Sequence, residues 1–453
     1  MSNSTGQAGS GVTTAAAARP TLVRSRGLLG ALGFGLAYMM PMASFTTYGV
    51  VNTLTDGRIV LAYVVTLVAM LFTATSYASM AGAHPKAGAA YSYTRLTFGA
   101  HAGFLGGWTI LLDYVLLPMM AYLVIGVYLH AAVPAVPQAV WILAALVLVT
   151  LLNVTGVKLL SRVSNVIVAA QVVFLVVFAF LALQPVLGGT VAAVPAGDTG
   201  VATLLAGSAV LCYSFLGFDA VASIAEETKD PARTVPRAIV LVTLCGGVLF
   251  IVVSWLSQVV FPDWRAYTSP DAAANDVVGA AGGHLLTAFF TAAFVAGCFG
   301  AVMAQQATAA RVLFAMGRDG LLPRRVFGTL SARFGTPVGS TLVIAAVALV
   351  ALFVDLTFAS SLINFGALAA FTLVNLAVIK HFLIDEKRRG ALAGLRYGVL
   401  PGIGCALTVW LWTSLSLPAL VVGLAWLALG AGWLAVTTRG FRVKPAELAL
   451  EEE

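Results

Sequence analysis

Charged residues are scarce in this sequence. Asp, Glu, Lys and Arg together make up 9% of its 453 residues, whereas roughly a quarter of a soluble globular protein is charged. Hydrophobic residues make up 60%, and a soluble fold of this length has no interior large enough to hide them. Because a lipid bilayer solvates apolar side chains, the composition predicts an integral membrane protein.

Sequence patterns for metal ions and disulfides are missing as well. Small buried core residues are the expected role of the four cysteines, because each lies inside an apolar run without metal-site spacing. They are Cys212, Cys245, Cys298 and Cys405. The five histidines are scattered near the ends of predicted helices, which gives a histidine proton relay little support. We expect no bound metal and no cofactor.

Enzyme motifs do not occur in the sequence either. It contains no Walker loop, no nucleophile elbow and no zinc motif. The segments between the apolar runs are short and leave no room for a catalytic domain. The sequence therefore predicts that the protein is not an enzyme.

The first 26 residues differ from the rest. They are rich in Gly, Ser, Thr and Ala, and Arg19, Arg24 and Arg26 are their only charges. We expect no signal peptide, because no apolar core precedes a small-residue cleavage site. We interpret residues 1–26 as a disordered cytoplasmic tail.

Twelve apolar runs follow this tail. A helix needs roughly 20 apolar residues to cross a bilayer. The runs that approach this length lie near 28–53, 59–83, 103–129, 138–155, 164–185, 201–226, 238–261, 284–308, 338–354, 357–384, 397–416 and 418–437. The division between the last two is the weakest, because only residues 414–418 separate them.

The distribution of basic residues supports this assignment. With the N-terminus in the cytoplasm, all 25 Lys and Arg residues except Arg58 and Arg265 fall on the cytoplasmic side, as the positive-inside rule requires. The net charge of +7 then reflects topology, and no nucleic-acid partner is expected. We predict a multi-pass protein of the plasma (inner) membrane with both termini in the cytoplasm.

Two acidic residues lie deep inside apolar runs, Asp113 in the third and Asp219 in the sixth. A carboxylate at the bilayer centre costs about 2.5–3.5 kcal/mol on insertion scales, and such residues usually face a cavity and serve a function there. For Asp113 a structural alternative stays open, in which the carboxylate hydrogen-bonds a neighbouring helix.

The first and sixth runs each contain a helix-breaking residue. Pro41 interrupts the first, since proline has no amide donor and clashes with the preceding turn. Gly217 lies two residues before Asp219 in the sixth. If the first ten helices form two halves of five, the interruptions occupy matching positions, a pattern that indicates a substrate site near the membrane midplane.

Several loop motifs, taken with these breaks, resemble the amino acid–polyamine–organocation superfamily of permeases. They follow the second, sixth and eighth runs and read PKAGAAYSY (85–93), EETKDPARTVPR (226–237), and MGRDGLLP (316–323) with GTP (335–337). The resemblance covers residue 27 to about residue 437. Bacterial putrescine importers share further stretches around residues 35–42, 111–119, 214–221 and 362–368.

The resemblance implies an all-α membrane fold of twelve transmembrane helices, with helices 1 and 6 broken. Two inverted five-helix repeats would occupy residues 27–196 and 197–390. Two further helices would occupy residues 391–437, and a cytoplasmic tail would follow at 438–453.

Roles for individual residues are implied as well. Asp219 matches a substrate-binding glutamate of related exchangers and would pair with a substrate ammonium. Tyr213 matches an aromatic that closes over the substrate from outside. There are two departures from the family. Gln171 stands where some proton-coupled members carry a lysine, which disfavours lysine-based proton coupling. Gln305 and Gln306 stand where the exchangers place a tryptophan, which points to a different substrate range.

The residues around the breaks favour a diamine over an amino acid. Permeases of amino acids typically hold the substrate carboxylate with amides of broken helix 1, but here Pro41 lacks one, and Met42 and Ala43 replace small glycines. Asp219 would bind one amine. Candidates near the other amine are Asp113, Tyr114 and Asn364. The remaining candidate residues are Ser214, Met40, Ala43 and Gln305 for the substrate site, and Phe215, Glu226 and Glu227, with Tyr213, for the gates.

The sequence thus predicts import of a small cationic polyamine by alternating access, driven by a proton gradient, the membrane potential or both. Between Thr291 and Thr308 the eighth helix has no Ser or Thr, which disfavours sodium coupling. An amino acid symporter or exchanger of the same superfamily stays open, because the motifs fit it equally well. A channel is less favoured, since broken helices with a buried acid fit alternating access better. The oligomeric state is left open.

Overall fold

The computed structural model describes residues 27–85, 89–156, 160–189, 200–318, 322–440 and 442. Over these residues the fold is entirely helical, and eleven helical segments are long and apolar enough to cross a membrane. The remaining predicted segment, 338–354, is the ninth along the chain and is present as a shorter apolar helix, Val338–Leu352. The predicted tail at 1–26, and that at 438–453 apart from residues 438–440 and 442, lie outside the described residues.

Most of the predicted helices are found within a few residues of their expected bounds. The unbroken ones are α3 (Ile59–Ala83), α5 (Ala100–Ala132), α6 (Gln138–Thr155), α7 (Leu160–Ala182), α10 (Pro231–Val260), α13 (Val338–Ala348), α14 (Leu356–Val378), α16 (Leu400–Thr413) and α17 (Leu417–Thr437). Short connecting helices are α4 (Ala89–Phe98), α8 (Gln184–Leu187), α12 (Arg324–Phe327) and α15 (Ala391–Gly394). Helix α4 was not predicted from the sequence.

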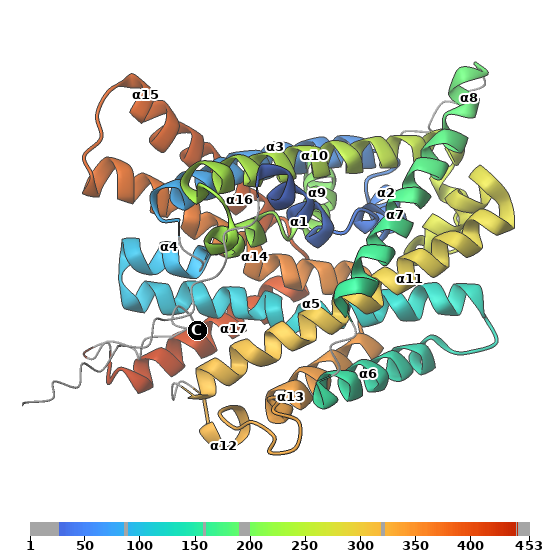
Figure 1. Cartoon of the computed structure of the whole chain (residues 1–453). Coiled ribbons are helices and arrows are strands. Elements are labelled where there is room, and N and C mark those ends of the chain that lie inside the picture. The colour runs from blue at the N-terminus through green and yellow to red at the C-terminus, as the bar shows by residue number, and fades with distance from the viewer. Residues whose placement is uncertain are drawn as a thin grey trace, which may run out of the picture.

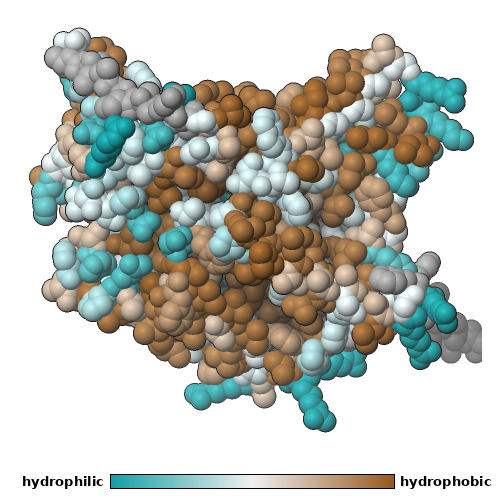
Figure 2. All heavy atoms as spheres, turned by 180° about the vertical axis from the view of Figure 1, so that it is seen from behind, coloured by the Kyte–Doolittle hydropathy of each residue, from teal (hydrophilic) through white to brown (hydrophobic). Residues whose placement is uncertain are grey.

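The long helices run roughly side by side between two ends of the molecule (Figure 1). At one end lie α4, α12 and α15, and at the other lie α8 and the connection between α5 and α6. Basic residues occur at the first end, including Arg324 and Arg325 in α12, so it is the predicted cytoplasmic end. Figure 2 shows hydrophobic residues over most of the middle of one face, with hydrophilic residues gathered mainly toward its margins. This distribution is expected of a surface in contact with lipid.

Helix α5 lies at the centre of the bundle, where it packs against both α11 (Ala273–Arg318) and α14. Its most apolar stretch is 78% buried, against 22% for α17 at the periphery. Helix α3 packs along α10 in a second layer. An acidic residue on α5 is therefore held away from lipid.

The first predicted span is broken where proline was expected to break it. It consists of α1 (Leu28–Tyr38), the 3-10 turn η1 (Ala43–Phe45) and α2 (Tyr48–Leu54). Met40, just before Pro41, has a φ of 58°, which is uncommon for a residue with a side chain. The chain thus reverses its local winding there and leaves the helical path.

The sixth predicted span is broken as well. It consists of α9 (Val201–Phe215) followed by the 3-10 helix η2 (Asp219–Glu227). Gly217 lies between them with a φ of 117°, which a residue without a Cβ adopts readily. Asp219 consequently begins a new helical segment.

The eighth predicted span begins earlier than expected. The helix α11 starts at Ala273 and bends at Gly282 and Gly283, whose backbone angles are not helical. The predicted start near residue 284 therefore corresponds to the helix after the bend.

Candidate substrate cavity

A cavity of about 80 Å³ lies where the two broken spans meet α5 and α11. This volume holds several water molecules. Its lining residues come from four parts of the chain: Tyr38, Met39, Met40, Ala43 and Thr46 from the first span; Asp113, Tyr114, Leu117, Ala121 and Val124 from α5; Tyr213, Leu216, Gly217, Asp219 and Ala220 from the sixth; and Cys298, Ala301 and Gln305 from α11. Both breaks thus deliver side chains to one site.

Asp219 reaches the cavity because the sixth span is broken. The backbone N–H of Gly217 donates to Oδ1 of Asp219 over 3.3 Å. Asp219 also occupies the first turn of η2, where unpaired amides and the helix dipole favour a negative charge. The break therefore supplies local stabilisation for a carboxylate inside the membrane.

Asp113 faces the same cavity from α5, and Tyr114 lies beside it. The Oδ1 atom of Asp113 is buried and accepts no hydrogen bond from any described residue. A buried polar atom without a partner is costly, and such an atom often marks a place where a ligand binds. The unsatisfied oxygen favours the substrate-facing interpretation of Asp113 over the structural one.

The electrostatic character of the cavity is negative. Two carboxylates face it, and the described lining contains no Lys, Arg or His. The C-terminal ends of α1 and α9 also converge here, since Tyr38 ends one helix and Tyr213 lies in the last turn of the other. Helix C-termini carry partial negative charge, so these two helix ends add to the two carboxylates. The N-terminus of η2 also lies at the cavity, but Asp219 itself occupies it.

Backbone amides offer little to an anion. Around the first break, four lining residues already donate their backbone N–H groups to carbonyl oxygens of the chain. They do so at 2.8–3.3 Å and are Met39, Met40, Ala43 and Thr46. In the sixth span Leu216 and Ala220 donate to carbonyls, and Gly217 donates to Asp219. A substrate carboxylate would have to displace one of these bonds.

Most of the predicted substrate-site residues lie in this cavity. They are Asp219, Asp113, Tyr213, Tyr114, Met40, Ala43 and Gln305. The Oε1 atom of Gln305 is buried and has no hydrogen-bond partner among the described residues, so this amide is available to a ligand.

Two other predicted substrate-site residues are not brought to the cavity. Ser214 Oγ lies 3.2 Å from the hydroxyl of Tyr63 in the core. Asn364 Nδ2 donates to the carbonyls of Ala209 at 2.7 Å and Val210 at 3.1 Å, which ties α14 to α9. These contacts give both residues structural roles in the conformation observed.

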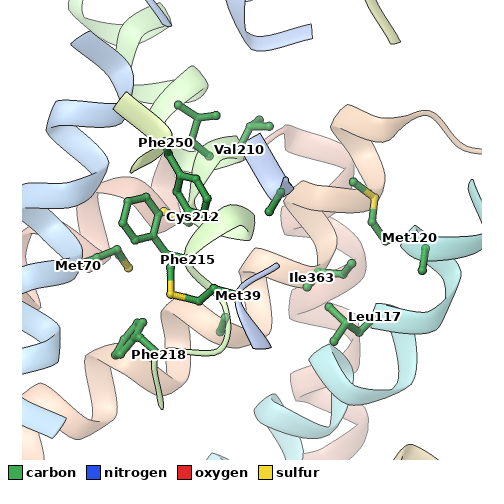
Figure 3. Packing of buried hydrophobic residues seen from close by; sticks show 14 of the residues in the cluster. Met39, Met70, Leu117, Met120, Val210, Cys212, Phe215, Phe218, Phe250 and Ile363 are labelled. Carbon is green, nitrogen blue, oxygen red and sulfur yellow. The ribbon is translucent and has the colours of Figure 1, made fainter. Parts of the chain in front are cut away.

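The predicted gate residues also differ in whether they line the cavity. Tyr213 lines the cavity, whereas Phe215 points into the core, with its ring 5.6 Å from that of Phe250 (Figure 3). Glu227 ends η2 and does not line the cavity. The backbone of Glu226 belongs to the same helix, and its side chain lies outside the described residues.

Eleven of the described lining residues were not among the predicted site residues, and three of these have a polar atom in the side chain that could contact a ligand or lie near one: Tyr38, Thr46 and Cys298. Tyr38 directly precedes the disrupted segment of the first span, and this position was a usable signal. Cys298 lies two turns before Gln305 on α11, so it shares its face. Nothing in the local sequence distinguishes Thr46 from its neighbours.

Gln171, noted for replacing a lysine, is 1% exposed on α7. It packs so closely on Gly297 of α11 that a Cβ there would lie 1.9 Å from its Nε2 atom. Gln171 therefore helps to set the approach of α7 to α11, next to the cavity residue Cys298.

Known proteins resemble this chain over most of its length. The family model described as amino acid permease matches residues 28–445. The low-affinity putrescine importer PlaP of Escherichia coli (strain K12) is 38% identical over 419 residues, with 90% of this chain and 92% of the relative covered. The branched-chain amino acid permease BcaP of Bacillus subtilis (strain 168) is 29% identical over 436 residues, with the same coverage.

The fold is also found among solved structures. A manganese transporter of Eremococcus coleocola superimposes with a TM-score of 0.55 over 94% of this chain and 98% of that one. The sequence identity is 13%, so this similarity concerns the fold alone.

Proposed function

Because the chain belongs to the amino acid permease family and is a membrane transporter rather than an enzyme, we propose that it imports a small diamine of the putrescine type. The observation that carries this proposal is the pair of carboxylates, Asp113 and Asp219, facing one cavity whose described lining has no basic side chain. Two negative charges in a low-dielectric site favour a ligand with two positive charges. Asp219 binds one ammonium and Asp113, with Tyr114, binds the other.

An amino acid is the second candidate substrate, and the relationship to a branched-chain amino acid permease supports it. Such a substrate needs a partner for its carboxylate. The cavity amides described above already donate to the chain, and the two carboxylates would repel a third. These features favour the diamine, as does the 38% identity to a putrescine importer.

We further propose that transport proceeds by alternating access between two inverted repeats, at 27–196 and 197–390. The two interruptions, near Pro41 and Gly217, occupy the first and sixth spans, and such matched breaks are typical of inverted-repeat transporters. The remaining helices, over 391–437, lie outside the repeats.

The membrane potential favours import of such a substrate. One elementary charge gains about 2.3 kcal/mol per 100 mV, so a divalent diamine gains about 4.6 kcal/mol on entering a negative cytoplasm. This energy supports concentrative uptake, with or without a coupled proton. The predicted location is the plasma (inner) membrane with cytoplasmic termini.

The test is uptake of labelled putrescine into proteoliposomes, comparing the wild type with Asp219→Asn. Removing one partner of a desolvated charge pair costs about 2–5 kcal/mol, so we expect kcat/KM to fall at least about 30-fold. Asp230→Asn is the matched control, because Asp230 is 62% exposed on the surface. Uptake of branched-chain or cationic amino acids without uptake of putrescine by the wild type would replace the diamine with the second candidate.

A further inference from the structure

Tyr38 occupies an unusual position among the residues that line the cavity. Tyr38 as a whole residue is 44% exposed, whereas the other described lining residues are buried or half-buried. Tyr38 therefore lies where the cavity meets the surroundings, at the end of α1 and directly before the first break.

The opposite end of the cavity is closed by aromatic packing. The lining residues Thr46 and Val124 are buried, and Phe45, the neighbour of Thr46 in the chain, is 1% exposed. It packs edge-on against the rings of Phe174, Phe178 and Phe290, with centroids 5.2–6.0 Å away. The hydroxyl of Tyr128 also donates to the Phe45 carbonyl at 2.9 Å. Access from that end would require this cluster to separate.

The direction of the open end follows from the order of residues along α5. This helix begins next to α4 and ends on the side of the molecule where α8 lies (Figure 1), and Asp113 precedes Val124 on it. Tyr38 lines the same cavity as Asp113 and Asp219, and its ring lies beside Gly217, two residues before Asp219. The exposed end of the cavity is thus the end toward α4, which is predicted to be cytoplasmic.

The ring of Tyr38 rests on the break of the sixth span. A Cβ on Gly217 would lie 2.5 Å from Cδ1 of Tyr38, so the absence of a side chain at Gly217 makes room for the ring. The two broken spans therefore meet at this contact. A movement of one break relative to the other would therefore shift the ring of Tyr38 against Gly217.

Two properties of Tyr38 favour contact with a substrate that carries two positive charges. The face of its ring attracts an ammonium group, and its hydroxyl can donate a hydrogen bond to a carboxylate when no substrate is present. Both groups lie beside the pair of acids that attracts the substrate.

We propose that Tyr38 contacts the bound substrate and forms the movable cover of the cavity on its cytoplasmic side. This role falls to Tyr38 rather than to Phe215, which points into the core. The identity of the substrate rests on the proposed function, whereas the position of the cover does not.

Transport kinetics test the contact with substrate. In proteoliposomes, Tyr38→Ala should raise the KM for putrescine about three- to thirtyfold, the range expected for a lost cation–π contact. Tyr38→Phe keeps the ring and should stay within about threefold of the wild type. The control is Phe34→Ala, because the ring of Phe34 lies 6.2 Å from that of Tyr38 but does not line the cavity. A wild-type KM in Tyr38→Ala would overturn the contact, and so would an equal change in Phe34→Ala.

Thiol labelling tests the cover without relying on the substrate. Tyr38→Cys is placed in a chain whose native cysteines are replaced by serine: Cys212, Cys245, Cys298 and Cys405. A membrane-impermeant maleimide should label it from the cytoplasmic side only, and putrescine should slow the labelling. Labelling from the outer side only would overturn the proposal. Cytoplasmic labelling that putrescine does not slow, in a protein that does not transport putrescine, would support the cover and reject the proposed substrate.

Discussion

Gln305 and Gln306 are adjacent on α11, but their side chains have different surroundings. Gln305 lines the cavity, and its buried Oε1 has no partner within the described part of the chain. The Oε1 of Gln306 accepts from the hydroxyl of Tyr122 at 2.9 Å and from Asn153 Nδ2 at 3.1 Å. Its Nε2 donates to Thr150 Oγ1 at 3.1 Å. The Oε1 of Gln305 can therefore accept a hydrogen bond from the substrate, whereas Gln306 connects α11 to α5 and α6.

These two glutamines make a matched pair of variants. Gln305→Ala should raise the KM for the transported cation about tenfold or more, the effect of losing a hydrogen bond to a charged group. It should change the thermal unfolding temperature little, because its oxygen is unsatisfied. Gln306→Ala should lower that temperature, since buried partners each lose a bond at about 1–3 kcal/mol. The measurements are the substrate KM and the thermal unfolding temperature of both purified variants. A reversal of the two effects would contradict the binding role of Gln305 and the packing role of Gln306.

Asp113 is predicted to bind the second ammonium group of the substrate. In Asp113→Asn, the KM for putrescine should rise about tenfold or more, because one ammonium loses its charged partner. Inhibition by n-butylamine, which has a single ammonium for Asp219, should stay within about threefold of the wild type. In Asp219→Asn both ligands should bind weakly. Equal losses for the two amines in Asp113→Asn would indicate that Asp113 has a structural role instead.

Gly217 is predicted to be intolerant of a side chain for two separate reasons. Its φ of 117° is strained for other residues, and a Cβ would meet Tyr38 at 2.5 Å. Gly99 is a useful control, because its φ is 91° and a Cβ there would meet no atom within 4 Å. Gly217→Ala should therefore lower transport at least tenfold, while Gly99→Ala shows only the cost of backbone strain. Similar transport by the two variants, normalised to folded protein, would show that the Tyr38–Gly217 contact is unimportant.

Much of the fold could be predicted because hydropathy and helix breakers act locally. The spans follow from the length of apolar runs, and Pro41 and Gly217 mark the breaks through their own backbone chemistry. Asp113 and Asp219 could be found because a carboxylate in an apolar run is costly. The helix α4 escaped prediction, because it is short and lies in a polar connection between longer apolar runs.

The rotation of each broken segment could not be predicted in the same way. Tyr213, Phe215 and Asp219 lie within seven residues, but Tyr213 and Phe215 belong to α9 and Asp219 follows the break at Gly217. Phe215 ends α9 with its ring against Phe250 in the core, and the φ of Gly217 then redirects the chain so that Asp219 faces the cavity. Likewise Asn364 is an equally polar candidate in the sequence, but its bonds to the α9 backbone become visible only when α14 and α9 are packed together.

Sodium independence is a final prediction, and it concerns the face of α11 that meets the first break. Transporters that bind sodium between these elements use hydroxyl ligands, but α11 carries no Ser or Thr between Thr291 and Thr308. Its described cavity residues are Cys298, Ala301 and Gln305, and a thiol is a poor ligand for a hard cation, which prefers oxygen. Uptake of putrescine into proteoliposomes should therefore be the same within about twofold when choline replaces sodium at constant ionic strength and membrane potential. An inside-negative potassium diffusion potential should stimulate uptake under both conditions, which shows that the vesicles are intact. Loss of uptake in choline alone would require a sodium ligand set elsewhere and would contradict the prediction.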